Sequence, residues 1–281
     1  MCVASGCTAC TGATVITAPG GRYTATLVPH VEQGTCGGAG PEAYFTFTLA
    51  SVSDVFLATH MSMGVNTVLY VRSCGCTGTQ IAGGCNTDAD GQATSRLTLT
   101  NLAAGTYHVF VDTVSGTPIG PVTLDAYITT PGVPGDRCGN PTFIPAGTTS
   151  IAGDTCTVPG DDETMLTGTP SCLYVGNGNE RIYYFFLPTA RSVTFSGCGG
   201  TTVYDSLAYV RTVCTDEAGG SQVACDDDGC GGAGGSCANP TWRSTFTQTL
   251  GPGLFYFLAD GFGSAGGSCN CGLYTYAITG L

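Results

Sequence analysis

Short apolar runs of about four to eight residues, rich in Val, Phe, Tyr, Leu and Thr, alternate with clusters of Gly, Asn and Asp along the chain. In residues 44–49 (YFTFTL), Phe45, Phe47 and Leu49 occupy every second position. This period of two is typical of an antiparallel strand with one buried face. No stretch shows the 3.6-residue apolar period of an amphipathic helix, so the pattern predicts an all-β protein.

The predicted strands fall into two groups of similar length. The first group comprises residues 14–17, 23–27, 44–49, 55–59, 67–72, 96–100, 107–112 and 122–128. The second comprises residues 183–187, 193–196, 206–211, 244–249, 254–259 and 274–278. About six to eight short strands per group predict a β-sandwich in each half of the chain.

The two groups are copies of one unit. The matching segments are EAYFTFTL (42–49) with ERIYYFFL (180–187), NTVLYVR (66–72) with DSLAYVR (205–211), and L-x-x-G-x-[YF]-x-x-x-x-D at 102–112 and 250–260. The Pro- and Gly-rich stretch 130–141 (TPGVPGDRCGNP) marks the joint between them. We therefore expect two tandem antiparallel, jelly-roll-like β-sandwiches, residues 1–131 (the first repeat, with an amino-terminal extension) and 132–281 (the second repeat), stapled by disulfides.

The low content and negative sign of the charged residues limit the classes of partner that the protein is expected to bind. Only 10% of the 281 residues are charged, none is lysine, and the net charge is −12. Nucleic acids and anionic membranes require cations, so neither is an expected partner. The acidic residues serve either solubility or cation binding, and the sequence leaves both open. No apolar run approaches the roughly 20 residues of a membrane span, so we expect no transmembrane segment.

Seventeen cysteines stand against three histidines. The CxC pairs that begin at Cys74 and Cys269 lie about 200 residues apart, unlike the ligand pairs of a zinc site. A disulfide framework, and with it an extracellular or cell-surface location, follows. The second repeat holds ten cysteines, which can all pair, whereas the first holds seven. The cysteine left over is either free or joins two chains.

The repeat suggests several pairings. We expect Cys214 to pair with Cys225, and Cys74 or Cys76 to pair with Cys85, closing the turn after the YVR strand. Aligning the copies places His60 opposite Cys198 and Cys36 near Cys172. If Cys172 pairs with Cys198, Cys36 must reach toward the amino-terminal Cys2, Cys7 and Cys10. Cys138 and Cys156 are also expected in disulfides.

An acidic cluster in the second repeat is the candidate metal site. Its residues are Asp205, Asp226, Asp227, Asp228 and Asp260. If their strands are neighbours, several carboxylates converge at one end of the sandwich, and such hard oxygen ligands suit Ca²⁺. The first repeat offers the weaker set Asn66, Asp88, Asp90 and Asp112. The alternative is that these side chains cap turns, so Ca²⁺ is a candidate cofactor and none is required.

The sequence predicts no enzyme, because it contains neither a Gly-x-Ser-x-Gly elbow nor an HExxH motif and has few histidines. The YDSLAYVR, CDDD and L-x-x-G-x-[FY]-x-x-x-x-D elements resemble the bacterial pre-peptidase C-terminal type of β-sandwich, particularly the cysteine-rich tandem form of secreted and surface proteins of myxobacteria and their relatives. The resemblance covers residues 40–131 and 137–281. It implies a non-catalytic accessory or surface role, and some members are similar to calcium-dependent matrix-binding domains. The first repeat departs from this pattern at Asn66 and His60.

Two functions follow as expectations. The first is a non-catalytic extracellular structural or surface protein that assembles with itself as a homo-oligomer or filament. The strand-like segment 13–18 fits the first repeat imperfectly, and we expect it to add to a neighbour's sheet. The second is a calcium-dependent adhesion or glycan-binding module, with a surface glycan as partner.

Overall fold

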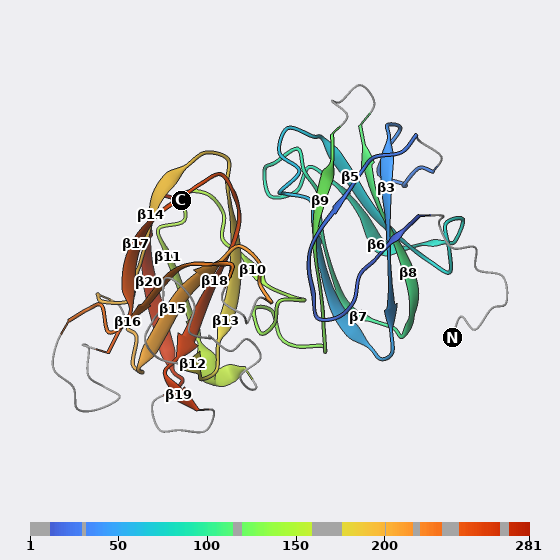
Figure 1. Ribbon diagram of the computed structural model, residues 1–281. Helices are drawn as coiled ribbons and strands as arrows, with labels where there is room; N and C mark the ends of the chain where they lie inside the picture. The colour runs from blue at the N-terminus through green and yellow to red at the C-terminus, as the bar shows by residue number, and fades with distance from the viewer. Residues whose placement is uncertain are drawn as a thin grey trace. The chain divides into compact units, whose positions relative to one another are not determined.

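The computed structural model describes residues 12–29, 32–114, 120–158, 176–199, 201–215, 220–231, 242–264 and 270–281. Within these ranges the chain forms strands and a single 3₁₀ turn, Thr155–Thr157. The chain divides into two compact units, Met1–Pro131 and Gly132–Leu281 (Figure 1). These units are the first and second repeats, and each is a disulfide-stapled β-sandwich, as the sequence predicted.

The first repeat contains one five-stranded and one four-stranded sheet. In spatial order the five strands are β1 (Thr14–Val15), β3 (Glu42–Leu49), β8 (Gly105–Thr113), β5 (Thr67–Ser73) and β6 (Gln80–Thr87). The four are β2 (Gly20–Ala25), β9 (Val122–Thr129), β4 (Ser53–Ala58) and β7 (Arg96–Leu102).

The second repeat has the same two sheets. The five strands are β10 (Thr142–Phe143), β13 (Arg181–Leu187), β18 (Gly253–Gly261), β15 (Ser206–Arg211) and β16 (Gln222–Asp227). The four are β11 (Ser150–Asp154), β20 (Leu273–Thr279), β14 (Arg191–Ser196) and β17 (Thr245–Leu250). A small parallel pair, β12 (Gly176–Asn177) and β19 (Gly263–Ser264), is additional.

Both repeats have jelly-roll topology. When the eight long strands of either repeat are numbered in chain order, the four-stranded sheet has the order 1-8-3-6 and the other sheet has 2-7-4-5. A short leading strand, β1 or β10, extends the second of these sheets by pairing in parallel with β3 or β13. The leading strand therefore belongs to the repeated unit.

The core lies between the two sheets of each repeat. Phe45, Phe47 and Leu49 are buried on one face of β3, which confirms the predicted alternation. In the second repeat the core is aromatic: the rings of Phe195 and Phe257 stack with their centroids 4.1 Å apart. Burial of such apolar side chains from both sheets is the main stabilising contribution to each sandwich.

The prediction for segment 13–18 was wrong. Thr14 and Val15 pair with Phe45 and Thr46 of the same chain, and the N–H of Ile16 donates to the Thr46 carbonyl at 2.8 Å. Only two residues have strand geometry, so the period-two pattern was too short to indicate its partner.

Strands β6 and β16 were missed, because their Gly, Cys and Asp residues are typical of loops. Both are edge strands that extend the hairpin after the YVR motif. In this geometry Cys85 lies opposite Tyr70 and Cys225 opposite Tyr209.

This register explains why the predicted disulfide pairings were wrong. Cys85 lies in the middle of a strand, away from the turn that holds Cys74 and Cys76, and it bonds to Cys36. The expectation that Cys36 reaches the amino-terminal cysteines is thereby also corrected. Cys74 and Cys76 are disulfide-bonded themselves. Cys2, Cys7 and Cys10 lie outside the described residues, so the prediction of a leftover cysteine stays a prediction.

The second repeat shows the same correction. The bonds are Cys138–Cys214, Cys156–Cys271 and Cys198–Cys230, with sequence separations of 76, 115 and 32 residues. Cys225 is disulfide-bonded, but not to Cys214. Cys198 bonds to Cys230, so the predicted Cys172–Cys198 pair was wrong, and Cys172 itself lies outside the described residues. Sandwich topology thus joins cysteines that are distant in sequence. The predictions for Cys214, Cys225 and Cys85 were wrong because they paired each cysteine with one nearby in the sequence.

The recurring Tyr-Val-Arg motif has a structural explanation. The Arg211 guanidinium lies over the Tyr209 ring, 4.9 Å from its centroid, and donates to the Cys214 carbonyl at 3.0 Å. In the first repeat Arg72 lies over Tyr70 and donates to the Cys76 carbonyl. Each arginine therefore fixes the turn after its strand by a cation–π contact and a hydrogen bond.

Candidate functional site

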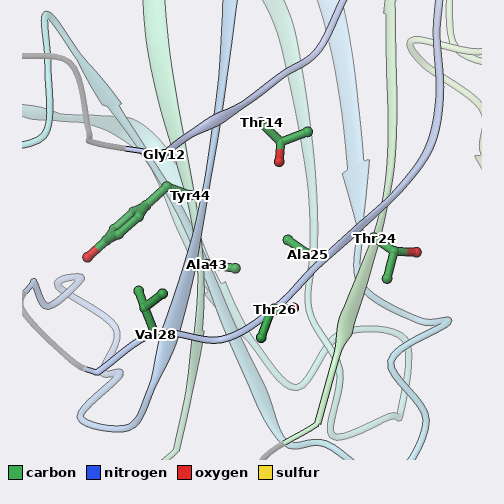
Figure 2. A pocket seen from close by; sticks show the side chains of 8 residues that line it. All are labelled: Gly12, Thr14, Thr24, Ala25, Thr26, Val28, Ala43 and Tyr44. Atoms are coloured by element: carbon green, nitrogen blue, oxygen red, sulfur yellow. The ribbon is translucent and has the colours of Figure 1, made fainter.

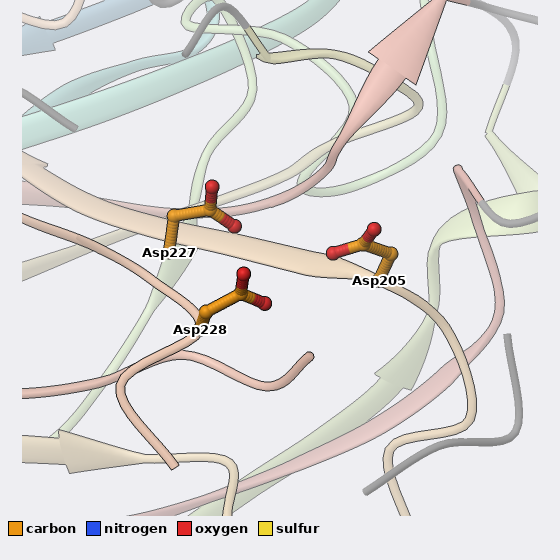
Figure 3. Close-up of side chains that lie close together, drawn as sticks. All are labelled: Asp205, Asp227 and Asp228. Atoms are coloured by element: carbon orange, nitrogen blue, oxygen red, sulfur yellow. The ribbon is translucent and has the colours of Figure 1, made fainter. Parts of the chain in front are cut away.

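Three of the five predicted metal ligands converge. Carboxylate oxygens of Asp205, Asp227 and Asp228 lie within 4.8 Å of one another, and Figure 3 shows the three groups directed into one space. Asp205 immediately precedes β15, Asp227 ends β16, and Leu207 pairs with Asp227 across the hairpin. Because side chains alternate along a strand, Asp205, Leu207 and Asp227 share one face of the sheet.

The electrostatics of this cluster favour a cation. Burial, together with repulsion from Asp228, raises the pKa of Asp205 to about 6. Burial and the neighbouring aspartates raise the pKa of Asp227 to about 7. A divalent cation held among the three groups would reverse the repulsion and favour the charged forms. Hard carboxylate oxygens around one point are the donor set that Ca²⁺ prefers.

Asp226 is directed away from this cluster, because it precedes Asp227 on the same strand. Its Oδ2 accepts the N–H of Thr245 at 2.7 Å and the N–H of Gly229 at 2.9 Å. In the first repeat Asn86 accepts the N–H of Arg96 at 3.0 Å in the same way. Asp226 therefore holds the start of the next strand, and the turn-capping alternative applies to it.

Asp260 is also structural. It is fully buried, accepts the N–H of Gly261, and receives the Tyr209 hydroxyl at 3.1 Å. Its counterpart Asp112 is equally buried and accepts the N–H of Thr113 at 2.6 Å. Both aspartates thus accept the N–H of the residue that follows them, and Asp260 does not lie in the cluster of Asp205, Asp227 and Asp228, contrary to its predicted role as a metal ligand.

The weaker set of the first repeat does not assemble into a site. Asp88 is exposed, whereas Asp112 is buried and accepts the N–H of Thr113. Asp90 accepts two hydrogen bonds from Arg96, of 3.0 and 3.1 Å. Asn66 stands where the second repeat has Asp205. Among the described residues, the only group of three or more clustered His, Cys, Asp and Glu ligands is therefore the one in the second repeat.

A buried Thr94–His60–Asp90 chain was not predicted. His60 Nδ1 lies 2.8 Å from Thr94 Oγ1, and Nε2 lies 2.9 Å from Asp90 Oδ2. Hydroxyl, imidazole and carboxylate follow the order used in nucleophilic catalysis. However, His60 is 0% and Thr94 6% exposed, so a substrate cannot reach the hydroxyl. We interpret these three hydrogen-bonded side chains as a structural cross-link.

The first repeat also contains a cavity of about 360 Å³ at the open side of its sandwich. Its lining comes from β1, β2, β3 and the segment after β2, as Figure 2 shows. The lining residues are Gly12, Thr14, Thr24, Ala25, Thr26, Val28, Ala43 and Tyr44. This lining carries threonine and tyrosine hydroxyls and no charged side chain, which suits a small neutral polar ligand.

Comparisons with known proteins add little. No family model and no curated protein matches the chain. A solved structure described as Paenibacillus xanthan lyase matches with 12% identity and a TM-score of 0.20, covering 90% of this chain and 25% of that one. This chain thus spans a quarter of the length of that chain, and the likeness is too low to carry an argument. None of the described segments forms a helix long and apolar enough to cross a bilayer.

Proposed function

We propose that this protein is a non-catalytic structural component of an extracellular surface or matrix and that it assembles with itself. The observation that carries the proposal is the four disulfides Cys36–Cys85, Cys138–Cys214, Cys156–Cys271 and Cys198–Cys230, which join residues 32 to 115 positions apart. Such long-range disulfides form and persist in oxidising surroundings. They restrict the unfolded chain and so preserve a fold outside the cell, where it is not renewed.

Self-assembly is supported by the edge strand β17. Its sequence, TFTQTL, has neither charge nor proline, and among the described strands β17 pairs only with β14. Edge strands normally carry charges or prolines that block pairing with another chain. An unprotected, threonine-rich edge is therefore suited to adding a strand from a second copy.

The test introduces a charge at this edge in the full chain. Wild type should form oligomers or filaments under non-reducing conditions, visible by analytical ultracentrifugation and electron microscopy. Thr247→Lys should abolish them, whereas Ser51→Lys, the same charge change in an exposed turn of the first repeat, should not. Monomeric wild type at high concentration would overturn the assembly proposal.

A second candidate function is that of a calcium-dependent adhesion or glycan-binding module, which would hold a surface glycan when Ca²⁺ is bound. The specific observation in its favour is the convergence of Asp205, Asp227 and Asp228.

The single tryptophan provides the test. The Trp242 carbonyl accepts the N–H of Ser206 at 3.0 Å, so the backbone of Trp242 lies beside the residue that follows Asp205. Tb³⁺, which replaces Ca²⁺, should luminesce on excitation of Trp242. Asp227→Asn should remove this signal and Asp226→Asn should retain it. Ca²⁺ at 100 times its dissociation constant should stabilise the fold by about 2.7 kcal/mol. If neither luminescence nor stabilisation appears, calcium binding is excluded.

A further inference from the structure

The cross-link of His60 and Asp90 occupies the place of a disulfide in the second repeat. His60 is the second residue after β4 and Cys198 the second after the equivalent strand β14. Asp90 follows Cys85 by five residues, as Cys230 follows Cys225. The two pairs are therefore at equivalent positions in the jelly roll.

The backbone around the two pairs is also the same. In the first repeat the N–H of Thr59 donates to the Ser95 carbonyl at 2.9 Å. In the second, the N–H of Gly197 donates to the Ser244 carbonyl at 3.0 Å. Each pair thus connects the loop after the third long strand to the loop that precedes the sixth, within one conserved hydrogen-bonded frame.

The two cross-links close loops of nearly equal length by different chemistry. Cys198 and Cys230, 32 residues apart, are joined covalently with their Cα atoms 5.3 Å apart. His60 and Asp90, 30 residues apart, are joined by a hydrogen bond of 2.9 Å. The imidazole is fully buried and uses its other nitrogen on Thr94, so the side chain is fixed at both ends.

Charged groups face His60 from two sides. Asp90 and its partner Arg96 lie on the loop before β7 and on β7 itself. Asp125 of β9, paired with Arg22 of β2 at 2.8 Å, interacts electrostatically with His60. The imidazole therefore contacts the aspartate of one Arg–Asp pair and interacts electrostatically with the aspartate of another.

We infer that the two repeats share one cross-linking site with different chemical sensitivity: acid opens it in the first repeat and a dithiol reductant opens it in the second. Protonation of the Asp90 carboxylate from solvent removes the charged acceptor of the His60 and Arg96 hydrogen bonds. In the second repeat a dithiol transfers two electrons and two protons to Cys198–Cys230, giving two thiols and the oxidised cyclic disulfide of the reagent.

The direction of the acid effect follows from Asp90. Burial opposes its ionisation, but hydrogen bonds from His60 and Arg96 outweigh it and lower the pKa of Asp90 below its ordinary value. A carboxyl whose pKa is lower in the folded state stabilises the fold above its ordinary pKa of about 4. This stability is lost as the pH falls below that value.

The experiment replaces the His60–Asp90 hydrogen bond of the first repeat by a disulfide, in the full chain. In the double variant His60→Cys/Asp90→Cys, peptide mapping without reduction should find a new disulfide between the two positions. Peptide-resolved hydrogen exchange, corrected for the intrinsic pH dependence, should show that acid opens residues 59–66 and 88–95 in wild type. It should not open them in the double variant.

Asp90→Asn should open the same segments at neutral pH, with exchange about a hundredfold faster, because it removes one partner of a buried pair. The matched control is Asp88→Asn, the same change at an exposed position of the same loop, which should leave exchange unchanged. The inference is overturned if the new cysteines stay unlinked in a folded chain, or if acid opens wild type and double variant alike. Equal effects of Asp90→Asn and Asp88→Asn would also overturn it, whether or not the cysteine variant folds.

Discussion

Replacing Asp226 by Ala and by Asn separates structural carboxylates from metal ligands. The Asp226 carboxylate accepts two backbone N–H groups, from Thr245 at 2.7 Å and from Gly229 at 2.9 Å. A hydrogen bond to a charged group contributes about 1.5–3 kcal/mol, and partial exposure places these two near the lower figure. Asp226→Ala should therefore cost about 3 kcal/mol, or about 10 °C in the melting temperature of a unit of this size.

Asp226→Asn should cost less than about 1 kcal/mol, because an amide oxygen performs the same task at Asn86 in the first repeat. Removing the charge also relieves repulsion by Asp228. Thermal unfolding followed by circular dichroism, with Trp242 fluorescence as the signal of the second repeat, measures both variants. Asn86→Ala removes one hydrogen bond to a neutral amide, so it should cost about 1 kcal/mol in the first repeat. The reasoning fails if Asp226→Asn destabilises as much as Asp226→Ala, or if it abolishes Tb³⁺ luminescence as Asp227→Asn should.

Three further predictions concern stability. Replacing both Cys156 and Cys271 by Ser should cost about 4.8 kcal/mol, from the 115-residue separation that their bond closes, as measured by urea unfolding; a loss below about 1 kcal/mol would contradict it. Burial raises the pKa of Asp112 to about 7. The negative charge of nearby Glu42 adds to this increase, and backbone hydrogen bonds to the carboxylate reduce it. Its contribution to stability is therefore full below about pH 4 and is lost as the pH rises through 7, and Asp112→Asn should abolish this fall in unfolding free energy between about pH 4.5 and 8. Phe195→Ala, which empties a fully buried position stacked on Phe257, should cost about 3–5 kcal/mol in the second repeat, and hydrogen exchange should show the first repeat unchanged.

The sequence by itself determined the fold class and the repeat. Alternation in residues 44–49 follows from the geometry of a strand and needs no knowledge of its neighbours, so the buried face of β3 was predictable. The duplicated segments likewise indicated two similar sandwiches. The same local rules failed at β6 and β16, whose Gly, Cys and Asp residues favour loops when considered alone. These residues form strands because a neighbouring strand pairs with them.

The sequence predicted that the candidate site consists of aspartates, but it did not predict which aspartates belong to it. Five aspartates were expected to converge, and three do. Asp226 and Asp227 are adjacent in sequence, yet only Asp227 belongs to the cluster, because pairing of β16 with β15 sends successive side chains to opposite faces.

Tertiary structure alone decided the cross-links. Cys36 reaches Cys85 and Cys198 reaches Cys230 because the jelly-roll path brings distant loops together, and nothing local to either cysteine records that path. The same path places His60 against Asp90. The alternation of side chains in a strand depends on a few consecutive residues, so it can be recognised in the sequence. Which distant residues form a cross-link depends on the closure of long loops, which the whole fold determines.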